Sequence, residues 1–263
     1  MIRFFALVFV LALPLWGAGA LLGNLPGSPM NLPVGALMFP CPLIAAAILL
    51  RRRGGGGAIK RLLRSAYLAK GLRRAPWLAV TVLLVPAIYL LAYGVALLTG
   101  PLDGQHSPLL AAPLLFAVFF LAAVGEETGW MGYAADPLQQ RWGALGAGLI
   151  LGTVWGAWHI VPLVQAGRSP VWIAWWFVGT VATRMVIVWL YNAAGGSVLS
   201  AIIFHAMLNV MPSLLPGYVE SELLVACTAL VTVLVAAALF AFSPRPPAMS
   251  SWRPAAGSRG STS

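Results

Sequence analysis

The chain has 263 residues, of which 60% are hydrophobic and 8% are charged, whereas soluble domains carry about 25% charged residues. This composition excludes an ordinary soluble domain and indicates a polytopic membrane protein. The net charge of +10 does not predict a nucleic-acid partner, because nine of the sixteen basic residues lie between Arg51 and Arg74. The two cysteines, Cys41 and Cys227, are far apart in apolar stretches and predict neither a disulfide framework nor a metal knuckle.

Eight stretches have roughly the 20 apolar residues that a helix needs to cross the hydrocarbon core of a bilayer. They predict an all-α protein with about eight transmembrane helices, near residues 4–22, 33–50, 77–98, 108–135, 143–164, 171–191, 197–215 and 223–242. The first stretch could instead be a signal peptide, because residues 18–20 look like a small-residue cleavage site. Removal of residues 1–20 would leave the new N-terminus outside the cell.

A basic loop, residues 51–74, follows the second predicted helix. In it, Ile59, Leu62 and Leu63 recur at helical spacing, which predicts either a helix lying on anionic lipid or a plain cytoplasmic anchor. Both alternatives put this loop in the cytoplasm, and counting eight helices puts both termini there too. We expect a multi-pass protein of the cell membrane, with helices in residues 1–107 and a disordered tail at 243–263.

Two adjacent glutamates, Glu126 and Glu127, lie in the fourth apolar stretch. A carboxylate at membrane depth costs roughly 3 kcal/mol, and two side by side repel each other, so one should be protonated or both should have partners. Such a cost usually indicates function. The alternative is that the pair lies at the level of the lipid headgroups, where it costs little and has no special meaning.

Two of the three histidines also lie in apolar stretches, His159 in the fifth and His205 in the seventh. Asn209 follows His205 by four residues, so their side chains share one helical face. A single histidine in a membrane helix is more often a packing residue. Two histidines, an amide and a diacid at one depth indicate a catalytic site instead.

Counting along the helices places these groups at a common depth. If the fourth and fifth helices form a hairpin that turns at Arg141–Trp142, Glu126 lies within reach of His159. Glu126 and His205 each lie nine residues from the cytoplasmic end of their helix, or about 14 Å deep. Glycine pairs at 125 and 129, and at 152 and 156, predict close approach of the helix backbones around the site.

The ordered set of motifs resembles the CAAX prenyl endopeptidase and bacteriocin-processing family of intramembrane proteases, known as CPBP or Abi. Residues 108–215 carry the resemblance through Glu126-Glu127, Trp155-x-x-x-His159 and His205-x-x-x-Asn209. The family's first motif is Glu-Glu-x-x-x-Arg, and Met131 stands where that arginine is expected. Arg184, in the sixth stretch, is the intramembrane cation that could replace it.

The resemblance implies a catalytic core in the fourth to seventh helices that hydrolyses a peptide or protein in or at the membrane. Cleavage of prenylated CAAX tails is the family's eukaryotic task. Glu126 would act as general base on a water that His159 also holds, while His205 and Asn209 donate to the oxyanion. Glu127 would tune Glu126 or take a second metal-ligand role.

The family is commonly labelled a metalloprotease, and Glu126, His159 and His205 could hold Zn²⁺ with a fourth position for water. Water activated without a metal fits the same residues. We also expect Trp155, Trp158 and Arg184 to border the substrate cleft.

Two other functions stay open. A catalytically impaired relative acting as an immunity factor or membrane scaffold is favoured by Met131, and a proton-coupled transporter could use Glu126 and His159 as a relay. A peptidase needs its polar groups to converge, whereas a relay spreads them across the membrane. In every case residues 216–242 supply the last transmembrane helix.

Overall fold

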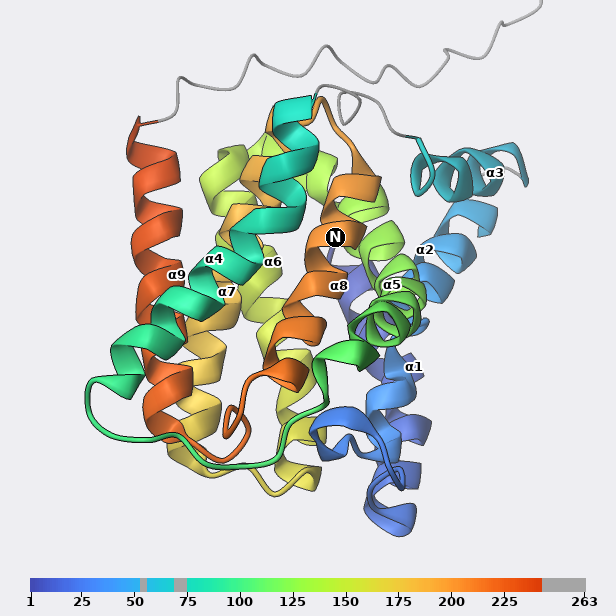
Figure 1. Ribbon diagram of the computed structural model, residues 1–263. Coiled ribbons are helices and arrows are strands. Elements are labelled where there is room, and N and C mark those ends of the chain that lie inside the picture. The colour runs from blue at the N-terminus through green and yellow to red at the C-terminus, as the bar shows by residue number, and fades with distance from the viewer. Residues whose placement is uncertain (53–55, 69–74, 243–263) are drawn as a thin grey trace, which may run out of the picture.

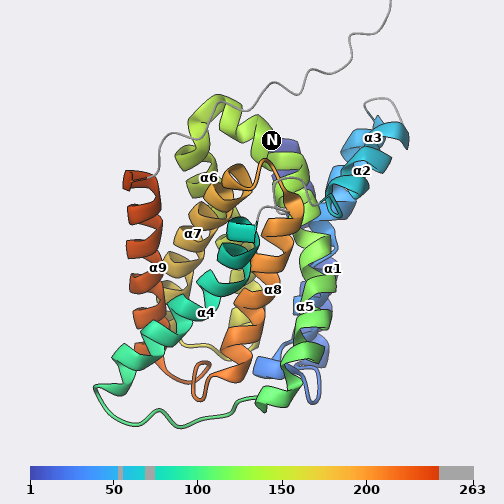
Figure 2. The same cartoon turned by 45° about the horizontal axis from the view of Figure 1, so that its top comes forward.

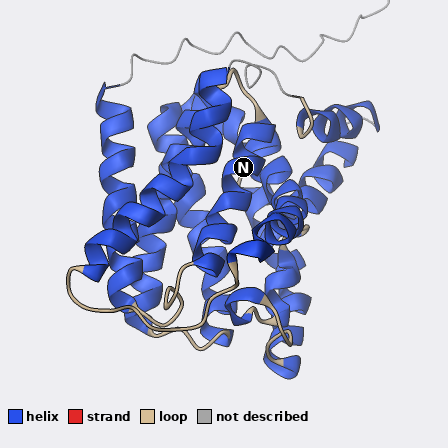
Figure 3. Cartoon of the chain, viewed as in Figure 1, coloured by secondary structure: helices blue, strands red, loops and turns tan. Residues whose placement is uncertain are grey.

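The computed structural model describes residues 1–52, 56–68 and 75–242. Within these ranges the regular secondary structure is helical, apart from an isolated bridge between Asn24 and Pro33, and loops connect the helices (Figure 3). In chain order the elements are α1 (Ile2–Leu22), η1 (Pro29–Asn31), η2 (Val34–Met38), α2 (Cys41–Arg52), α3 (Gly56–Ser65), α4 (Ala75–Leu97), η3 (Leu109–Ala111), α5 (Ala112–Gly129), η4 (Trp130–Ala135), α6 (Asp136–Gln165), α7 (Pro170–Ala193), α8 (Val198–Leu214) and α9 (Glu222–Phe242).

The helices confirm the predicted all-α membrane fold. Six helical segments of the described residues are long and apolar enough to cross a membrane, and α8 is a shorter apolar helix. One of the six, Leu109–Gln165, has 57 residues and is interrupted at Gly143, whose φ of 68° and ψ of 175° leave helical geometry. Glycine permits this positive φ. The two arms of that segment, the other five and α8 together give the eight predicted crossings (Figures 1 and 2).

A single π-helical turn, η4, follows the glutamate pair. Pro137 comes next, at the start of α6, and has no N–H to donate to the carbonyl one turn earlier. The wider π turn accommodates this missing bond, so the helix continues to Gly143 although its sequence becomes polar after Ala135. We had expected the fourth helix to end at that change of polarity.

Helix packing differs from the simple hairpin that we expected. In the described part of the chain, α5 packs closely against α8 and α2, and α6 packs against α7, but α5 and α6 are not a closely packed pair. The chain connects α5 to the rest of α6 through η4 and the helical residues 136–142. The predicted glycine contacts do form: a Cβ on Gly129 would lie 2.4 Å from the carbonyl carbon of Pro42, and one on Gly152 would lie 2.8 Å from the Cα of Val181.

The basic loop contains one described helix. α3 ends at Ser65 and lies beside the end of α2 (Figure 1). Leu62 is only 6% exposed and packs towards Gly132 of η4, whereas Tyr67 is 66% exposed. Protein therefore covers part of the apolar face that we expected to meet lipid. Residues 69–74 and the predicted disordered tail, 243–263, lie outside the described residues.

Candidate active site

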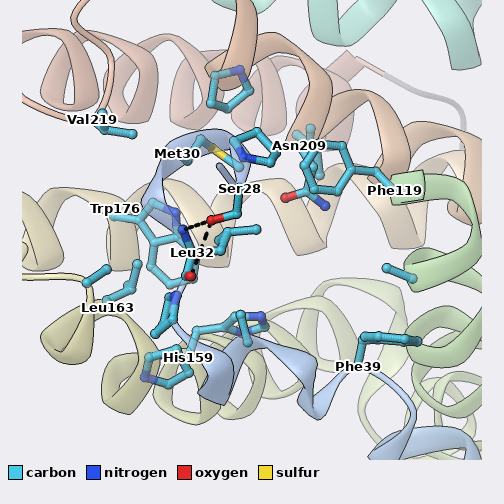
Figure 4. A pocket seen from close by; sticks show the side chains of 18 of the residues that line it. Ser28, Met30, Leu32, Phe39, Phe119, His159, Leu163, Trp176, Asn209 and Val219 are labelled. Atoms are coloured by element: carbon cyan, nitrogen blue, oxygen red, sulfur yellow. Dashed lines mark hydrogen bonds between the residues drawn. The ribbon is translucent and has the colours of Figure 1, made fainter. Parts of the chain in front are cut away.

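A cavity of about 350 Å³ lies inside the helical bundle. Glu126 of α5, Trp155 and His159 of α6, and His205 and Asn209 of α8 all line it. Figure 4 shows Asn209 beside Phe119, with His159 across the cavity from them. The structure thus brings four of the five predicted catalytic side chains to one space.

Glu126 lies in the cavity wall and is 6% exposed. The indole N–H of Trp155 donates a hydrogen bond of 2.7 Å to its Oε2. No other described residue donates a hydrogen bond to the Glu126 carboxylate, so Oε1 is left to act on a bound molecule. A carboxylate held on one oxygen and free on the other has the geometry of a general base.

Glu127 lies behind the cavity and is fully buried. Its Oε2 accepts a hydrogen bond of 2.6 Å from Nη1 of Arg184, and its Oε1 lies 2.7 Å from Nδ1 of His205. Successive residues of an α-helix point about 100° apart, which is why one glutamate faces the cavity and the next faces α7 and α8. The buried charge of Glu127 is balanced by Arg184.

Trp155 is the centre of the site. Its ring lies 5.1 Å from the ring of His205 and 5.2 Å from that of His159, both in edge-to-face arrangements. The guanidinium carbon of Arg184 lies 4.2 Å from the Trp155 ring centroid, within cation–π range. One indole therefore contacts groups from α6, α7 and α8 while it donates to Glu126 on α5.

His159 is fixed by its own helix. Its Nδ1 donates to the carbonyl oxygen of Trp155 over 2.9 Å, and its ring packs edge-on against Trp158, 4.9 Å away. A neutral ring that donates from Nδ1 keeps the lone pair on Nε2. His159 can therefore accept a hydrogen bond from a molecule in the cavity.

His205 and Asn209 lie one turn apart on α8, as predicted, and both line the cavity. Because Nδ1 of His205 faces Glu127, Nε2 is the ring nitrogen left for a ligand. The amide nitrogen of Asn209 lies 3.5 Å from the carbonyl oxygen of His205, a long contact that leaves the amide available to another acceptor.

Of the three residues expected at the substrate cleft, Trp155 lines the cavity, whereas Trp158 and Arg184 do not. Both are completely buried, Trp158 against His159 and Trp130, and Arg184 against Glu127 and Trp155. They form the support behind the cavity wall. Trp158 was expected at the cleft because it adjoins His159, and Arg184 because it is an intramembrane cation, but neither feature indicates which way a side chain points.

The outer end of the cavity is formed by loops that sequence reasoning missed. Arg168 donates to the carbonyl oxygens of Val219, at 3.0 Å, and Met30, at 2.7 Å, which ties three loops together. Burial raises the pKa of the nearby Tyr218 phenol to about 12, so this lining residue stays neutral at physiological pH. Residues 25–39 have no motif that could have predicted their place in the wall.

The residues present do not fit a three-ligand metal site as they are arranged. Among the described residues, no three His, Cys, Asp or Glu side chains are grouped so that they could hold one ion. Trp155 also occupies one oxygen of Glu126, whereas Nε2 of His159 and of His205 stays free. We therefore derive no chemical step through a metal.

Two comparisons with known proteins agree with the motifs. Residues 108–211 match the family described as type II CAAX prenyl endopeptidase, Rce1-like. The chain is also 32% identical over 155 residues to CAAX prenyl protease 2 of Methanococcus maripaludis. The aligned region covers 52% of this chain and 55% of the relative. The chain therefore spans about half the length of this curated relative.

The matched range contains every motif residue from Glu126 to Asn209 and coincides closely with the core predicted from the sequence. Through this core of α5 to α8, the chain is similar to type II CAAX prenyl endopeptidases.

Proposed function

We propose that the protein is an intramembrane endopeptidase in which Glu126 activates the attacking water. The observation that carries this proposal is the convergence of Glu126, His159, His205 and Asn209 on one cavity. Four polar groups from three helices have no reason to share a membrane-embedded space unless they act on a common ligand.

The proposed chemistry uses the free atoms of each side chain. Oε1 of Glu126 and Nε2 of His159 accept the two hydrogens of one water. As the water oxygen bonds to the scissile carbonyl carbon, Glu126 takes its proton, and it later returns that proton to the departing amine nitrogen.

The developing oxyanion needs donors on the opposite wall. The Asn209 amide can donate in any state, and His205 can donate from Nε2 when its ring is protonated, because its Nδ1 already faces Glu127. Glu127 lies outside the cavity, so we assign it to holding His205 rather than to proton transfer from water.

The substrate that we propose is a peptide segment at the end of a lipid-modified, membrane-associated protein. The name of the relative, CAAX prenyl protease 2, gives this class. The mainly apolar wall of the cavity, with residues such as Leu32, Phe119 and Trp176, supports it. We also propose that the protein lies in the cell membrane with loop 51–74 and both termini in the cytoplasm, next to anionic lipid.

The other two functions fit this arrangement less well. A proton relay would spread its titratable groups along the bundle, whereas these four line one space. Met131 favours an impaired scaffold because it leaves the motif without its arginine, but Arg184 supplies a cation to the glutamate pair from another helix.

The test is cleavage of a membrane-anchored peptide library by the purified protein in detergent. Wild type should cleave, Glu126→Gln should not, and Glu220→Gln, which changes an exposed glutamate outside the cavity, should cleave like wild type. A parallel series with a strong chelator separates metal-dependent from metal-free activation. Cleavage by Glu126→Gln at the wild-type rate would contradict the base assignment.

A further inference from the structure

Arg184 is a buried cation that the proposed chemistry does not use. It is fully buried, does not line the cavity, and lies 57 residues along the chain from its partner Glu127. A charge buried at this depth in a membrane protein is costly, so its retention calls for a function. Its contacts indicate which one.

The guanidinium acts on both glutamates, on one directly and on the other through a tryptophan. Nη1 donates to Glu127 at 2.6 Å, and Cζ lies over the Trp155 ring, 4.2 Å from the ring centroid. Trp155 in turn donates to Glu126 at 2.7 Å. Arg184 therefore supports Glu127 directly and Glu126 through one intervening indole.

These contacts come from different helices. Arg184 lies on α7, Trp155 on α6 and the glutamates on α5, although α5 and α6 are not closely packed against each other. Without the guanidinium, the indole would lose the surface that sets its orientation. Glu126 would then lose a fixed donor, and the water-binding oxygen would lose its position.

We propose that Arg184 is the positioning residue for both glutamates, Glu127 directly and Glu126 through Trp155. This inference rests on the proposed peptidase function, since it assigns a role within the same site. It identifies the guanidinium shape, and not the positive charge alone, as the feature that matters for Glu126. Lysine would keep the charge beside Glu127 but could not cover the Trp155 ring as a flat plate.

The test is a double-substitution cycle on cleavage kinetics. Arg184→Lys should lower kcat about 100-fold with KM changed less than about twofold, because a small displacement of the general base affects the transition state and not substrate binding. Trp155→Phe removes the donor to Glu126 and should have a similar effect. The double variant should be no slower than the slower single one, because both changes break the same connection.

The chain offers a matched control. Arg168 also lies over a tryptophan, with 5.7 Å between Cζ and the ring of Trp172, but it contacts neither glutamate. The kcat effects of Arg168→Lys and Trp155→Phe should therefore multiply. If the effects of Arg184→Lys and Trp155→Phe multiply as well, or if folded Arg184→Lys has wild-type kcat, the positioning role is wrong.

Two further measurements keep the test decisive. In Arg184→Met/Glu127→Gln both charges are removed, so this variant should melt at a higher temperature than Arg184→Met yet remain slow. The indole N–H resonance of Trp155, assigned with Trp155→Phe, should shift in Arg184→Lys and not in Arg168→Lys. Failure of wild type to cleave would reject the peptidase, whereas an unshifted resonance in Arg184→Lys would reject the positioning role by itself.

Discussion

Glu126 and Glu127 are neighbours in the chain with opposite surroundings. Glu126 borders a cavity and has one hydrogen-bond donor, while Glu127 is enclosed and has two nitrogen partners. Removing the negative charge should therefore have different consequences at the two positions. One glutamate faces the cavity, and the other lies behind its wall.

Glu127→Gln should destabilise the fold, whereas Glu126→Gln should not. The first leaves the buried Arg184 without its counter-charge, and breaking a buried pair in this way costs about 3–5 kcal/mol. Thermal unfolding of both variants in the same detergent measures the difference. Equal melting temperatures would mean that the Glu127–Arg184 pair contributes nothing to stability.

Asn209→Ala should lower kcat about 10²–10³-fold with little change in KM, as is typical when an oxyanion donor is removed. Met207→Leu is a suitable comparison, because Met207 lies on the same helix but does not line the cavity. Steady-state kinetics of the two variants measure the changes in kcat and in KM. An Asn209→Ala enzyme altered in KM alone would place Asn209 in substrate binding.

Motif spacing predicted which side chains gather but not the role of each one in the site. The motifs and the depth count predicted that Glu126, His159, His205 and Asn209 gather, although the hairpin assumed in that count does not form. Which glutamate faces the cavity depends on the rotation of α5, and that rotation is set by its packing against α2 and α8. The pairing of Arg184 with Glu127 across 57 residues has no local pattern at all.

At the scale of the helices, α5 is positioned by contact between backbones. The α carbon of Gly129 approaches Pro42 so closely that an added Cβ would lie 2.4 Å from the carbonyl carbon. This contact holds the first residues of α2 against the helix that carries both glutamates. The rotation of α5, and with it the direction of Glu126, depends on glycine at this position.

Gly129→Ala should destabilise the protein by about 1–3 kcal/mol, because the inserted methyl group overpacks the contact between α5 and α2. Gly94→Ala should be neutral or slightly stabilising, since a Cβ on this residue of α4 would meet nothing within 4 Å. Melting temperatures and cleavage rates should be recorded together. A Gly129→Ala protein as stable as Gly94→Ala would show that α2 moves aside freely.

Hydropathy predicted the number of membrane crossings but not the ends of the helices. The fourth helix continues through polar residues 136–142 because a π turn accommodates Pro137. Hydropathy could not predict this continuation, because it does not depend on the spacing of backbone hydrogen bonds. Residues 25–39 form part of the cavity wall although they have neither a motif nor helical periodicity. Their place is decided by tertiary contacts such as those of Arg168.

The whole molecule has two unlike ends. α3 lies at one, and the loops that connect α1 to α2, α4 to α5 and α8 to α9 lie at the other (Figure 1). The wall of the cavity continues into the first and last of these loops, through Met30 and Val219. The site therefore extends towards the end of the bundle away from the basic loop.

This arrangement predicts the sidedness of labelling. In a variant lacking Cys41 and Cys227, a cysteine at Lys60 should react with a membrane-impermeant maleimide only after the cytoplasmic face is opened, and one at Gln105 should react in intact cells. Both positions are exposed, so accessibility in the fold is not limiting. The reverse pattern would invert the proposed orientation.

Trp155 also has a consequence for how this sequence can change over time. One indole joins Glu126, His205 and Arg184, so four helices share a single side chain at their centre. A replacement at position 155 disturbs all of these partners together, and no change at one partner alone can compensate. We therefore expect the residues at these four positions to change together. In a library that randomises all four jointly, active clones will carry specific combinations rather than independently tolerated residues.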